Sequence, residues 1–257
     1  MTSTDTESLL RRLEQRVEEL EAELTRVADR GEIENLFARY MYLHNAFRDE
    51  EIIDLWVKEG TPGIHAEYGN VGVYDTYESV TAYHRGRPTP EGKLIMHSIS
   101  TPVIEVAADG QTAKGVWILF GTESGLVVKG DDDEIAGQPS SIFSPGEVDG
   151  KKVWAHWCWA KYGLDFLKQD GEWKIWHFHC YEVNRTPFEE NWVTFAAKNA
   201  EFAKENVMYF GEDGKPVFMP EPDRPSTFVW EYGPHAAAVL EPRPPEPYAT
   251  FDETFEY

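Results

Sequence analysis

The feature that most constrains the fold is a pair of strand-like segments within 152–183, divided by Asp170-Gly171. Asp-Gly is a strong signal for a tight turn, so 152–167 and 172–183 are predicted to form the two strands of a β-hairpin. A second Asp-Gly pair at 109–110 predicts another hairpin, between 102–107 and 112–121. Hairpins at this spacing imply an antiparallel sheet. Since helical patterns precede the strands, the predicted fold class is α+β.

Helices are expected mainly before the sheet. Segment 7–30 has six apolar residues in steps of three and four, typical of a coiled-coil seam: Leu10, Leu13, Val17, Leu20, Leu24 and Val27. Gly31 is expected to end this helix. A second helix should span 32–47, with shorter ones at 49–57, 77–84 and 190–205. The seam could pack on its own domain or pair with another subunit, and both interpretations stay open.

The last fifty residues have a different composition. Half of the chain's sixteen prolines lie between Pro220 and Pro247. Seven aromatic residues accompany them: Phe228, Trp230, Tyr232, Tyr248, Phe251, Phe255 and Tyr257. We expect an extended arm across the surface of its own or a neighbouring subunit, with disorder as the alternative. The chain is therefore divided into a helical extension (1–31), an α+β domain (32–205) and this arm (206–257), and 122–151 is expected to be a long loop.

Charge and cysteine content narrow the possible partners. The formal net charge is −22, which would repel nucleic acid and anionic membranes. Cys158 and Cys180 lack the spacing of a redox or metal motif, and no apolar signal segment precedes them. We therefore expect reduced thiols in a cytoplasmic protein. No glycine-rich phosphate loop is present, so no nucleotide cofactor is expected.

Three segments together resemble a known family. They are 33–40 with Asp54-Leu55-Trp56, Met96-His97 with 102–106 and Asp109-Gly110, and 165–167 with 170–175. In order and spacing they are similar to the SnoaL-like family of the nuclear-transport-factor-2-like superfamily, over about 32–190. The resemblance implies a curved sheet wrapped around helices to form a cone. It also implies catalysis without a metal or other cofactor.

Members of this family differ in function, so the resemblance allows several functions for this chain. Members include dehydratases of the scytalone and bile-acid types, isomerases, cyclases, non-catalytic binders, and lyases that release formaldehyde from lignin-derived diaryl compounds. In the bile-acid dehydratase pattern a helix Tyr precedes a catalytic Asp, and a strand His pairs with an Asp on the next strand. Tyr40 and His97 match this pattern, but the two Asp positions fall at Asn45 and near Phe120. That reaction is therefore not carried over, and His44 is expected to take part of the lost role.

The long hairpin predicts which histidines would face the cavity. A two-residue turn pairs Tyr162 with His179 and Leu164 with His177, which places His156 on the same face. We assign this face to the cavity. The opposite face carries Trp157, Trp159, Trp176 and Phe178 and should be covered by a second subunit or by the arm. A register error of one residue would reverse the assignment.

The predicted site combines imidazole and phenol groups, which suit acid/base chemistry near neutral pH. The candidate catalytic residues are Tyr40, His44, His97, His177 and His179. The candidate substrate-binding residues are Asn45, Tyr68, Trp117, His156, Tyr162 and Trp173. The pair His177-x-His179 could also bind a metal with one of the cone histidines, but we predict no metal.

The sequence-based hypothesis is a cofactor-independent lyase. It would eliminate water or formaldehyde from a hydroxylated aromatic, lignin-derived or polycyclic small molecule. An isomerase or cyclase with the same pocket, and a non-catalytic ligand-binding or scaffold protein, are the alternatives. The apolar helix seam and the Trp-rich face predict a homo-oligomer, either a dimer or a trimer.

Overall fold

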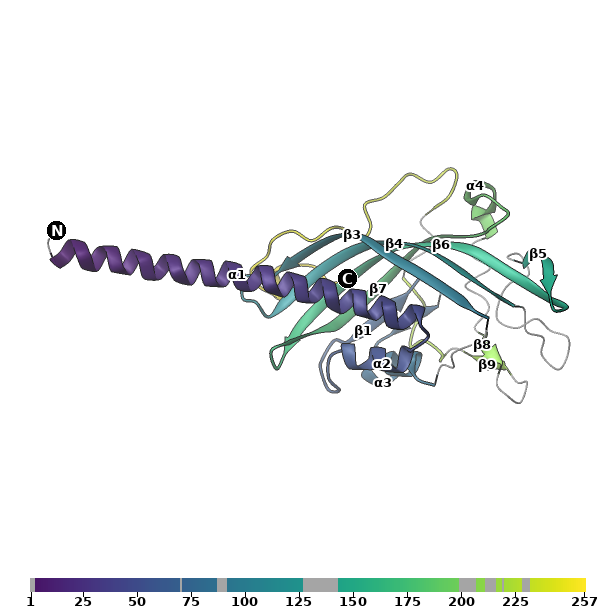
Figure 1. Cartoon of the computed structure of the whole chain (residues 1–257), viewed down its shortest axis with the longest axis horizontal. Coiled ribbons are helices and arrows are strands. Elements are labelled where there is room, and N and C mark those ends of the chain that lie inside the picture. The colour runs from purple at the N-terminus through teal and green to yellow at the C-terminus, as the bar shows by residue number, and fades with distance from the viewer. Residues whose placement is uncertain are drawn as a thin grey trace.

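The computed structural model describes residues 3–69, 71–86, 92–126, 143–198, 207–210, 216–218, 220–227 and 232–257. A long helix projects from a strongly curved sheet, which has two short helices near its edge (Figure 1). The helices are α1 (Ser3–Asn45), α2 (Asp49–Ile52), η1 (Ile53–Leu55), α3 (Tyr77–His84), α4 (Trp192–Phe195) and η4 (Phe251–Glu253). The strands are β1 (His65–Tyr68), β2 (Gly72–Tyr74), β3 (Leu94–Val106), β4 (Thr112–Leu126), β5 (Phe143–Val148), β6 (Lys151–Gln169), β7 (Glu172–Pro187), β8 (Val207–Phe210) and β9 (Pro216–Phe218).

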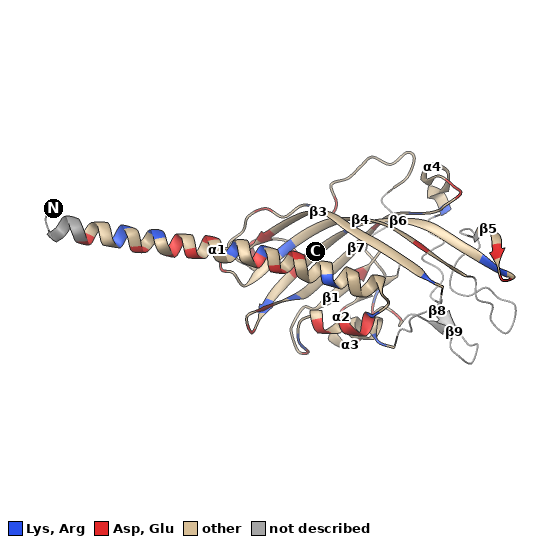
Figure 2. Cartoon of the chain, in the orientation of Figure 1, with Lys and Arg blue, Asp and Glu red and all other residues tan. Residues whose placement is uncertain are grey.

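Helix α1 is continuous over 43 residues, so the predicted break at Gly31 is wrong. A side chain at Gly31 would meet open space, and a single interior glycine costs a helix only about 1 kcal/mol relative to alanine. The first half of α1 projects from the body, with charged residues along it (Figures 1 and 2). The second half packs into the sheet, where Ile33, Phe37 and Met41 are buried.

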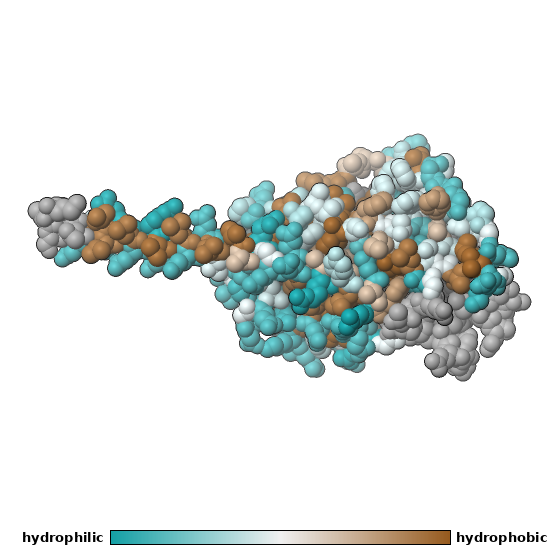
Figure 3. All heavy atoms as spheres, viewed as in Figure 1, coloured by the Kyte–Doolittle hydropathy of each residue, from teal (hydrophilic) through white to brown (hydrophobic). Residues whose placement is uncertain are grey.

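The apolar seam of α1 lies on the projecting half. Its members are all exposed: Leu10, Leu13, Val17, Leu20, Leu24 and Val27. They form a hydrophobic strip along the helix in the space-filling view (Figure 3). The seam therefore does not pack on its own domain, which removes one of the two sequence interpretations.

The main sheet has the strand order β2-β1-β7-β6-β4-β3, and β5 pairs with β6 in the described part of the chain. Neighbouring strands are antiparallel except for β1 and β7, which run parallel. Both predicted hairpins are present, but their strands extend further than expected. Residues 122–126 continue β4 and 143–148 form β5, so the loop predicted at 122–151 is wrong there, while 127–142 lie outside the described residues. The helix predicted at 190–205 begins as the short α4 and continues as a 3-10 turn over 196–198, and 199–205 lie outside the described residues.

A bulge in the long hairpin changes which residues face the core. Phe166 pairs with Ile175 as predicted, but the register shifts immediately beyond that pair. Tyr162 then pairs with Cys180 rather than His179, because Trp176 is an extra residue on β7. The two predicted histidines of β7 are thereby turned to the outer face of the sheet.

Aromatic side chains project from both the inner face and the outer face of the sheet. On the inner face, Phe37 of α1 packs against Trp117, Tyr162 and Phe178, with ring centroids 4.6, 5.2 and 6.4 Å away. On the outer face, the ring of Phe120 lies 5.6 Å from those of both Trp157 and Trp159.

The last described segment of the arm, 232–257, lies across the outer face of its own sheet. The main-chain oxygen of Tyr248 accepts a hydrogen bond from Ala108 N at 3.0 Å, and the Tyr257 ring covers Gly163. Two aromatic residues of the predicted arm, Phe228 and Trp230, lie outside the described residues. No helix in the described part of the chain has both the length and the apolar character needed to cross a membrane.

Candidate functional site

The end of α1 is joined to β3 by one side chain. The Asn45 amide donates to the main-chain oxygen of His97 at 3.0 Å and accepts from His97 N at 2.9 Å. Both polar atoms of the amide are therefore used in holding the backbone. Asn45 was predicted to bind substrate, but this geometry gives it a positioning role for His97.

A buried histidine–carboxylate pair lies between β3 and β4. Alternation along β3 turns His97 inward, and alternation along β4 from Trp117 turns Glu123 inward. His97 Nε2 lies 3.1 Å from Glu123 Oε1, and each residue is 7 % exposed. His97 Nδ1 is buried and has no hydrogen-bond partner among the described residues. A buried ring nitrogen of this kind is a candidate for contact with a bound molecule.

A buried arginine extends this pair into a network. Arg185 Nη1 donates to Glu123 Oε1 at 3.0 Å and lies 3.2 Å from His156 Nε2. Arg185 Nη2 donates to Glu182 Oε1 at 3.0 Å. A permanently charged guanidinium thus connects two carboxylates and an imidazole inside the sheet.

The pKa shifts assign the protons in this network. Burial lowers the pKa of His97, although Glu123 acts in the opposite direction. Burial alone would raise the pKa of Glu123, but Arg185 and His97 hold it well below its ordinary value. At neutral pH, His97 is therefore neutral beside an ionised carboxylate. The proton lies on Nε2, facing Glu123, and Nδ1 carries a lone pair that can accept a proton.

The remaining groups of the network are held in fixed roles. Burial lowers the pKa of His156 to about 3, so its ring is neutral and its Nε2 accepts the hydrogen bond from Arg185. Burial raises the pKa of Glu182 against the opposing effect of Arg185. His156 was predicted to bind substrate, but here it supports the arginine.

A second imidazole lies beside the pair. The ring centroids of His44 and His97 are 5.3 Å apart, and His44 Nδ1 lies 3.3 Å from Asp49 Oδ1. Tyr40, one helical turn before His44, stacks on Phe178 with centroids 5.4 Å apart. The structure therefore brings Tyr40, His44 and His97 together, as the sequence analysis expected.

The other predicted substrate-binding residues lie deeper in the fold. Tyr68 stacks on Tyr83 with ring centroids 3.9 Å apart. Trp117 and Tyr162 are buried around Phe37, and burial raises the pKa of Tyr162 well above its ordinary value. The Trp173 indole donates to Asp29 Oδ1 at 2.9 Å, where α1 meets the turn end of the hairpin. Tyr68 and Tyr162 both lie beside the Tyr40–Phe178 stack, with rings 5.2 and 5.4 Å from that of Phe178.

The prediction that His177 and His179 line the cone is wrong, because both lie on the outer face of the sheet. His177 Nδ1 is 2.8 Å from Asp165 Oδ2, and His179 Nε2 is 3.4 Å from Glu67 Oε1. The sheet therefore separates them from His97. The metal site considered for His177-x-His179 with a cone histidine is excluded for the same reason.

Sequence reasoning missed the acidic partners of the two cone histidines. Glu123 was missed because the predicted strand ended at Gly121, whereas β4 continues to Leu126. Continuing the alternation from inward Trp117 would have pointed Glu123 to the same side and Phe120 to the outside. Asp49 and Arg185 carried no local signal, since their roles depend on contacts with distant elements.

Three of the cone residues could also be considered as metal ligands. One donor atom from each of His97, Glu123 and Cys158 lies within 4.8 Å of the others. Burial raises the pKa of the Cys158 thiol well above its ordinary value, and Arg185 already occupies the Glu123 oxygen. A neutral thiol and a competing cation fit a metal poorly.

A curved sheet therefore wraps around helix α1, with a buried histidine–carboxylate pair on its inner face. Residues 25–179 match the SnoaL-like domain family, and the chain belongs to that family. No curated protein sequence matches it.

Several solved structures are similar to the chain at low identity. A candidate scytalone dehydratase from Novosphingobium aromaticivorans is 14% identical over 65% of this chain and 92% of its own, with a TM-score of 0.45. The type 3 hexachlorocyclohexane dehydrochlorinase LinA from Novosphingobium barchaimii is 15% identical over 66% and 96%, with a TM-score of 0.46. A nuclear-transport-factor-2-like protein from N. aromaticivorans is 17% identical over 71% and 94%, with a TM-score of 0.41. At these scores the likeness carries no argument about activity.

Proposed function

We propose that this protein is a cofactor-independent lyase that uses His97 as its general base. The observation that carries the proposal is the buried His97–Glu123 hydrogen bond, with His97 Nδ1 left for a substrate. A neutral imidazole whose far nitrogen faces an ionised carboxylate is suited to accept a proton, because the carboxylate stabilises the imidazolium that forms.

The proposed reaction is an elimination. For loss of water, His97 Nδ1 takes a proton from carbon and the C–H electron pair forms the new double bond. The neighbouring C–O bond breaks, and the hydroxyl leaves as water after it receives a proton. For loss of formaldehyde, His97 takes the proton of a primary hydroxyl and the C–C bond breaks. That electron pair forms the alkene as a hydroxyl on the next carbon leaves as water.

Two groups are placed to protonate the leaving hydroxyl. His44 lies beside His97 with Nδ1 directed at Asp49, and in its protonated, imidazolium form it can donate the proton from Nε2. Tyr40 carries a phenol on the same face of α1. His156 is not a candidate donor, because burial keeps its ring neutral and its Nε2 accepts from Arg185.

The proposed substrate is a hydroxylated aromatic or polycyclic molecule, including lignin-derived diaryl compounds. The support is the aromatic character of the inner face, where the rings of Tyr40 and Tyr68 each lie within stacking distance of Phe178. Flat apolar molecules bind well to aromatic walls that carry a few fixed polar groups.

The test is turnover by the purified protein on a panel of lignin-derived diols and hydroxysteroids. Alkene formation is followed by absorbance, and released formaldehyde is measured separately. We expect one class to be converted and His97→Gln to lower kcat by at least about a hundredfold, the usual contribution of a general base. The matched control is Ser98→Ala, the next residue on β3, which is exposed on the other side of the strand.

Each alternative predicts a different outcome. Full turnover by His97→Gln on the converted substrate would contradict the proposal. A double bond that moves without loss of water or formaldehyde would identify an isomerase instead. Saturable binding of panel members with no conversion by the wild-type protein would favour a ligand-binding protein.

We propose in addition that the α1 seam binds a second copy of the chain. The apolar residues of the seam are spaced alternately three and four positions apart, and they are exposed along the projecting half of the helix. Two copies of such a helix bury their own apolar strips against each other in a coiled coil, with the charged residues outside. A cytoplasmic location also remains part of the proposal, supported by two free, buried cysteines.

A further inference from the structure

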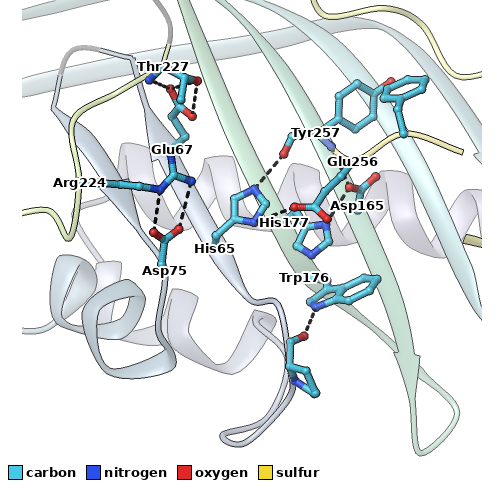
Figure 4. A network of polar contacts seen from close by, with 12 residues as sticks. His65, Glu67, Asp75, Asp165, Trp176, His177, Arg224, Thr227, Glu256 and Tyr257 are labelled. Carbon is cyan, nitrogen blue, oxygen red and sulfur yellow. Dashed lines mark hydrogen bonds and ion pairs between the residues drawn. The ribbon is translucent and has the colours of Figure 1, made fainter. Parts of the chain in front are cut away.

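A second cluster of ligating side chains lies on the outer face of the sheet, beneath the arm. Because β1 and β7 are parallel with His65 opposite His177, their side chains lie side by side. The two imidazole rings stack with centroids 4.5 Å apart and an interplanar angle of 11°. Glu256 of the arm reaches the same place, as Figure 4 shows. Three segments far apart in sequence therefore contribute one ligating group each.

The spacing of the donor atoms fits a small metal ion. One donor atom from each of His65, His177 and Glu256 lies within 4.8 Å of the others, and His65 Nδ1 is 3.4 Å from Glu256 Oε1. Ligand atoms about 2.0 Å from a tetrahedral zinc lie roughly 3.3 Å apart. One pair already has that spacing. The Glu256 side chain is 56% exposed, so surrounding residues do not enclose it.

Each imidazole is held in the tautomer that a metal requires. His65 Nε2 lies 2.9 Å from the main-chain oxygen of Tyr257, so this nitrogen carries the proton and Nδ1 has the lone pair. His177 Nδ1 donates to Asp165 Oδ2 at 2.8 Å, which leaves the lone pair on Nε2. Backbone and carboxylate acceptors on the far nitrogen are the usual supports of metal-binding histidines.

One ligand atom is left without a partner. His177 Nε2 is buried and makes no hydrogen bond within the described residues, and its side chain is only 1% exposed. A β-carbon added at Gly63 would lie 3.7 Å from this nitrogen, so no side chain of that residue fills the space. A buried nitrogen lone pair without a donor is costly unless something binds it.

The nearby charges allow a cation. Lys114 is close, but its ammonium is bonded to the other oxygen of Asp165 and to the main-chain oxygen of Phe255. Glu256 supplies a negative charge at the site, and the chain has a formal net charge of −22. These charges favour a divalent cation over an anionic ligand.

We propose that His65, His177 and Glu256 form a zinc site that fixes the arm to the outer face of the sheet. Two imidazoles and one carboxylate favour zinc and its transition-metal neighbours over magnesium and calcium, which prefer oxygen ligands. Three protein ligands leave a fourth position for water. The site is independent of His97, since the sheet lies between them.

The test is metal binding by the purified full-length protein after removal of metals with a chelator. Zn²⁺ is titrated against a chromophoric competitor, and Mg²⁺ is titrated in parallel. We expect one Zn²⁺ per chain and no saturable Mg²⁺ binding. Zn²⁺ should also raise the midpoint of thermal unfolding, since it binds only the folded site. Glu256→Gln should weaken Zn²⁺ binding by more than about tenfold, because even supporting residues of metal sites contribute this much.

Control variants keep the test decisive. Glu256 is exposed, so Glu256→Gln should fold even if a change at buried His177 does not, and His65→Gln provides a second ligand variant. Glu253→Gln, an exposed acidic residue three positions earlier, should bind Zn²⁺ like the wild-type chain. Absence of saturable Zn²⁺ binding would overturn the proposal. So would equal affinity in Glu256→Gln and His65→Gln, or loss of Zn²⁺ only in Cys158→Ser, which would place the ion in the cone.

Discussion

At the residue scale, Glu123 determines what His97 can do. Its carboxylate accepts the hydrogen bond from His97 Nε2, and Arg185 keeps that carboxylate ionised. A neutral acceptor could hold the imidazole ring in place, but it could not stabilise the imidazolium formed during proton transfer. The chemistry of His97 therefore depends on a residue on the next strand.

Substitution Glu123→Gln separates these two effects. The amide oxygen can still accept from His97 Nε2, so the ring orientation should be retained, but kcat should fall by about a hundredfold or more. Glu123 raises the pKa of His97, so its loss should lower that pKa. The base acts in its neutral form, so activity falls as pH drops through the His97 pKa. This acidic limb of the kcat/KM profile should therefore move to lower pH.

The control for this prediction is Phe120→Leu. Phe120 is at the family-pattern position but lies on the outer face, between Trp157 and Trp159. Its substitution should leave both kcat and the pH profile unchanged. An unchanged acidic limb in Glu123→Gln would show that His97 is not the group titrating in that profile.

At the element scale, the order of helices and strands was predictable from the sequence, but the facing of side chains was not. Turn signals at Asp109-Gly110 and Asp170-Gly171 located both hairpins. The bulge at Trp176 has no sequence signal, and its extra residue reverses the facing of the β7 side chains up to the second register shift, between Glu182 and Asn184. His177 was therefore assigned to the wrong face.

Long-range contacts explain the remaining errors at this scale. Gly31 was taken as a helix end, yet α1 continues because its second half is held by packing in the sheet. The arm's path across its own sheet depends on Tyr248 and Tyr257 meeting distant strands, which local pattern cannot predict.

The projecting half of α1 gives a prediction about assembly. We expect the wild-type chain to sediment as an oligomer at micromolar concentration. Leu20→Asp would put a charge into the apolar seam, and it should raise the dissociation constant by more than about a hundredfold, or roughly 3 kcal/mol. The measurement is analytical ultracentrifugation over a dilution series.

The control places the same charge on the opposite side of the helix. Gln15 is exposed and lies on the face of α1 opposite the seam, so Gln15→Asp should leave the association unchanged. Circular dichroism should show that both variants keep their helix content. A wild-type chain that remains monomeric throughout the dilution series would rule out pairing through α1.

At the scale of the whole molecule, the last residues of the arm are bonded to two neighbouring strands of the sheet, β4 and β6. Buried Lys114 of β4 bonds to Asp165 of β6 and to the main-chain oxygen of Phe255. The other oxygen of Asp165 accepts from His177 of β7 and, at 3.0 Å, from Tyr257 N. The last residues of the arm therefore complete a polar cluster that spans three strands, so the fold should lose stability when they are displaced.

Gly163→Ala tests this coupling, because the new methyl group would lie 2.5 Å from Tyr257 Cδ1. Displacing the ring should cost about 1–3 kcal/mol, as overpacking usually does. At this chain length, each kcal/mol corresponds to a fall of roughly 2–4 °C in the thermal midpoint. The measurement is thermal and urea unfolding in chelator, so that bound metal does not contribute. Gly31→Ala, where the methyl group meets open space, should not destabilise the protein.

A double-mutant cycle distinguishes loss of the arm contact from a general defect in β6. Tyr257→Ala removes the ring that Gly163→Ala would displace. In that background Gly163→Ala should cost less than about 0.5 kcal/mol, since the two changes then act on one contact. If Gly163→Ala destabilised the Tyr257→Ala protein as much as the wild-type protein, the strain would lie within the sheet. The absence of a side chain at Gly163 would then not serve to make room for the arm.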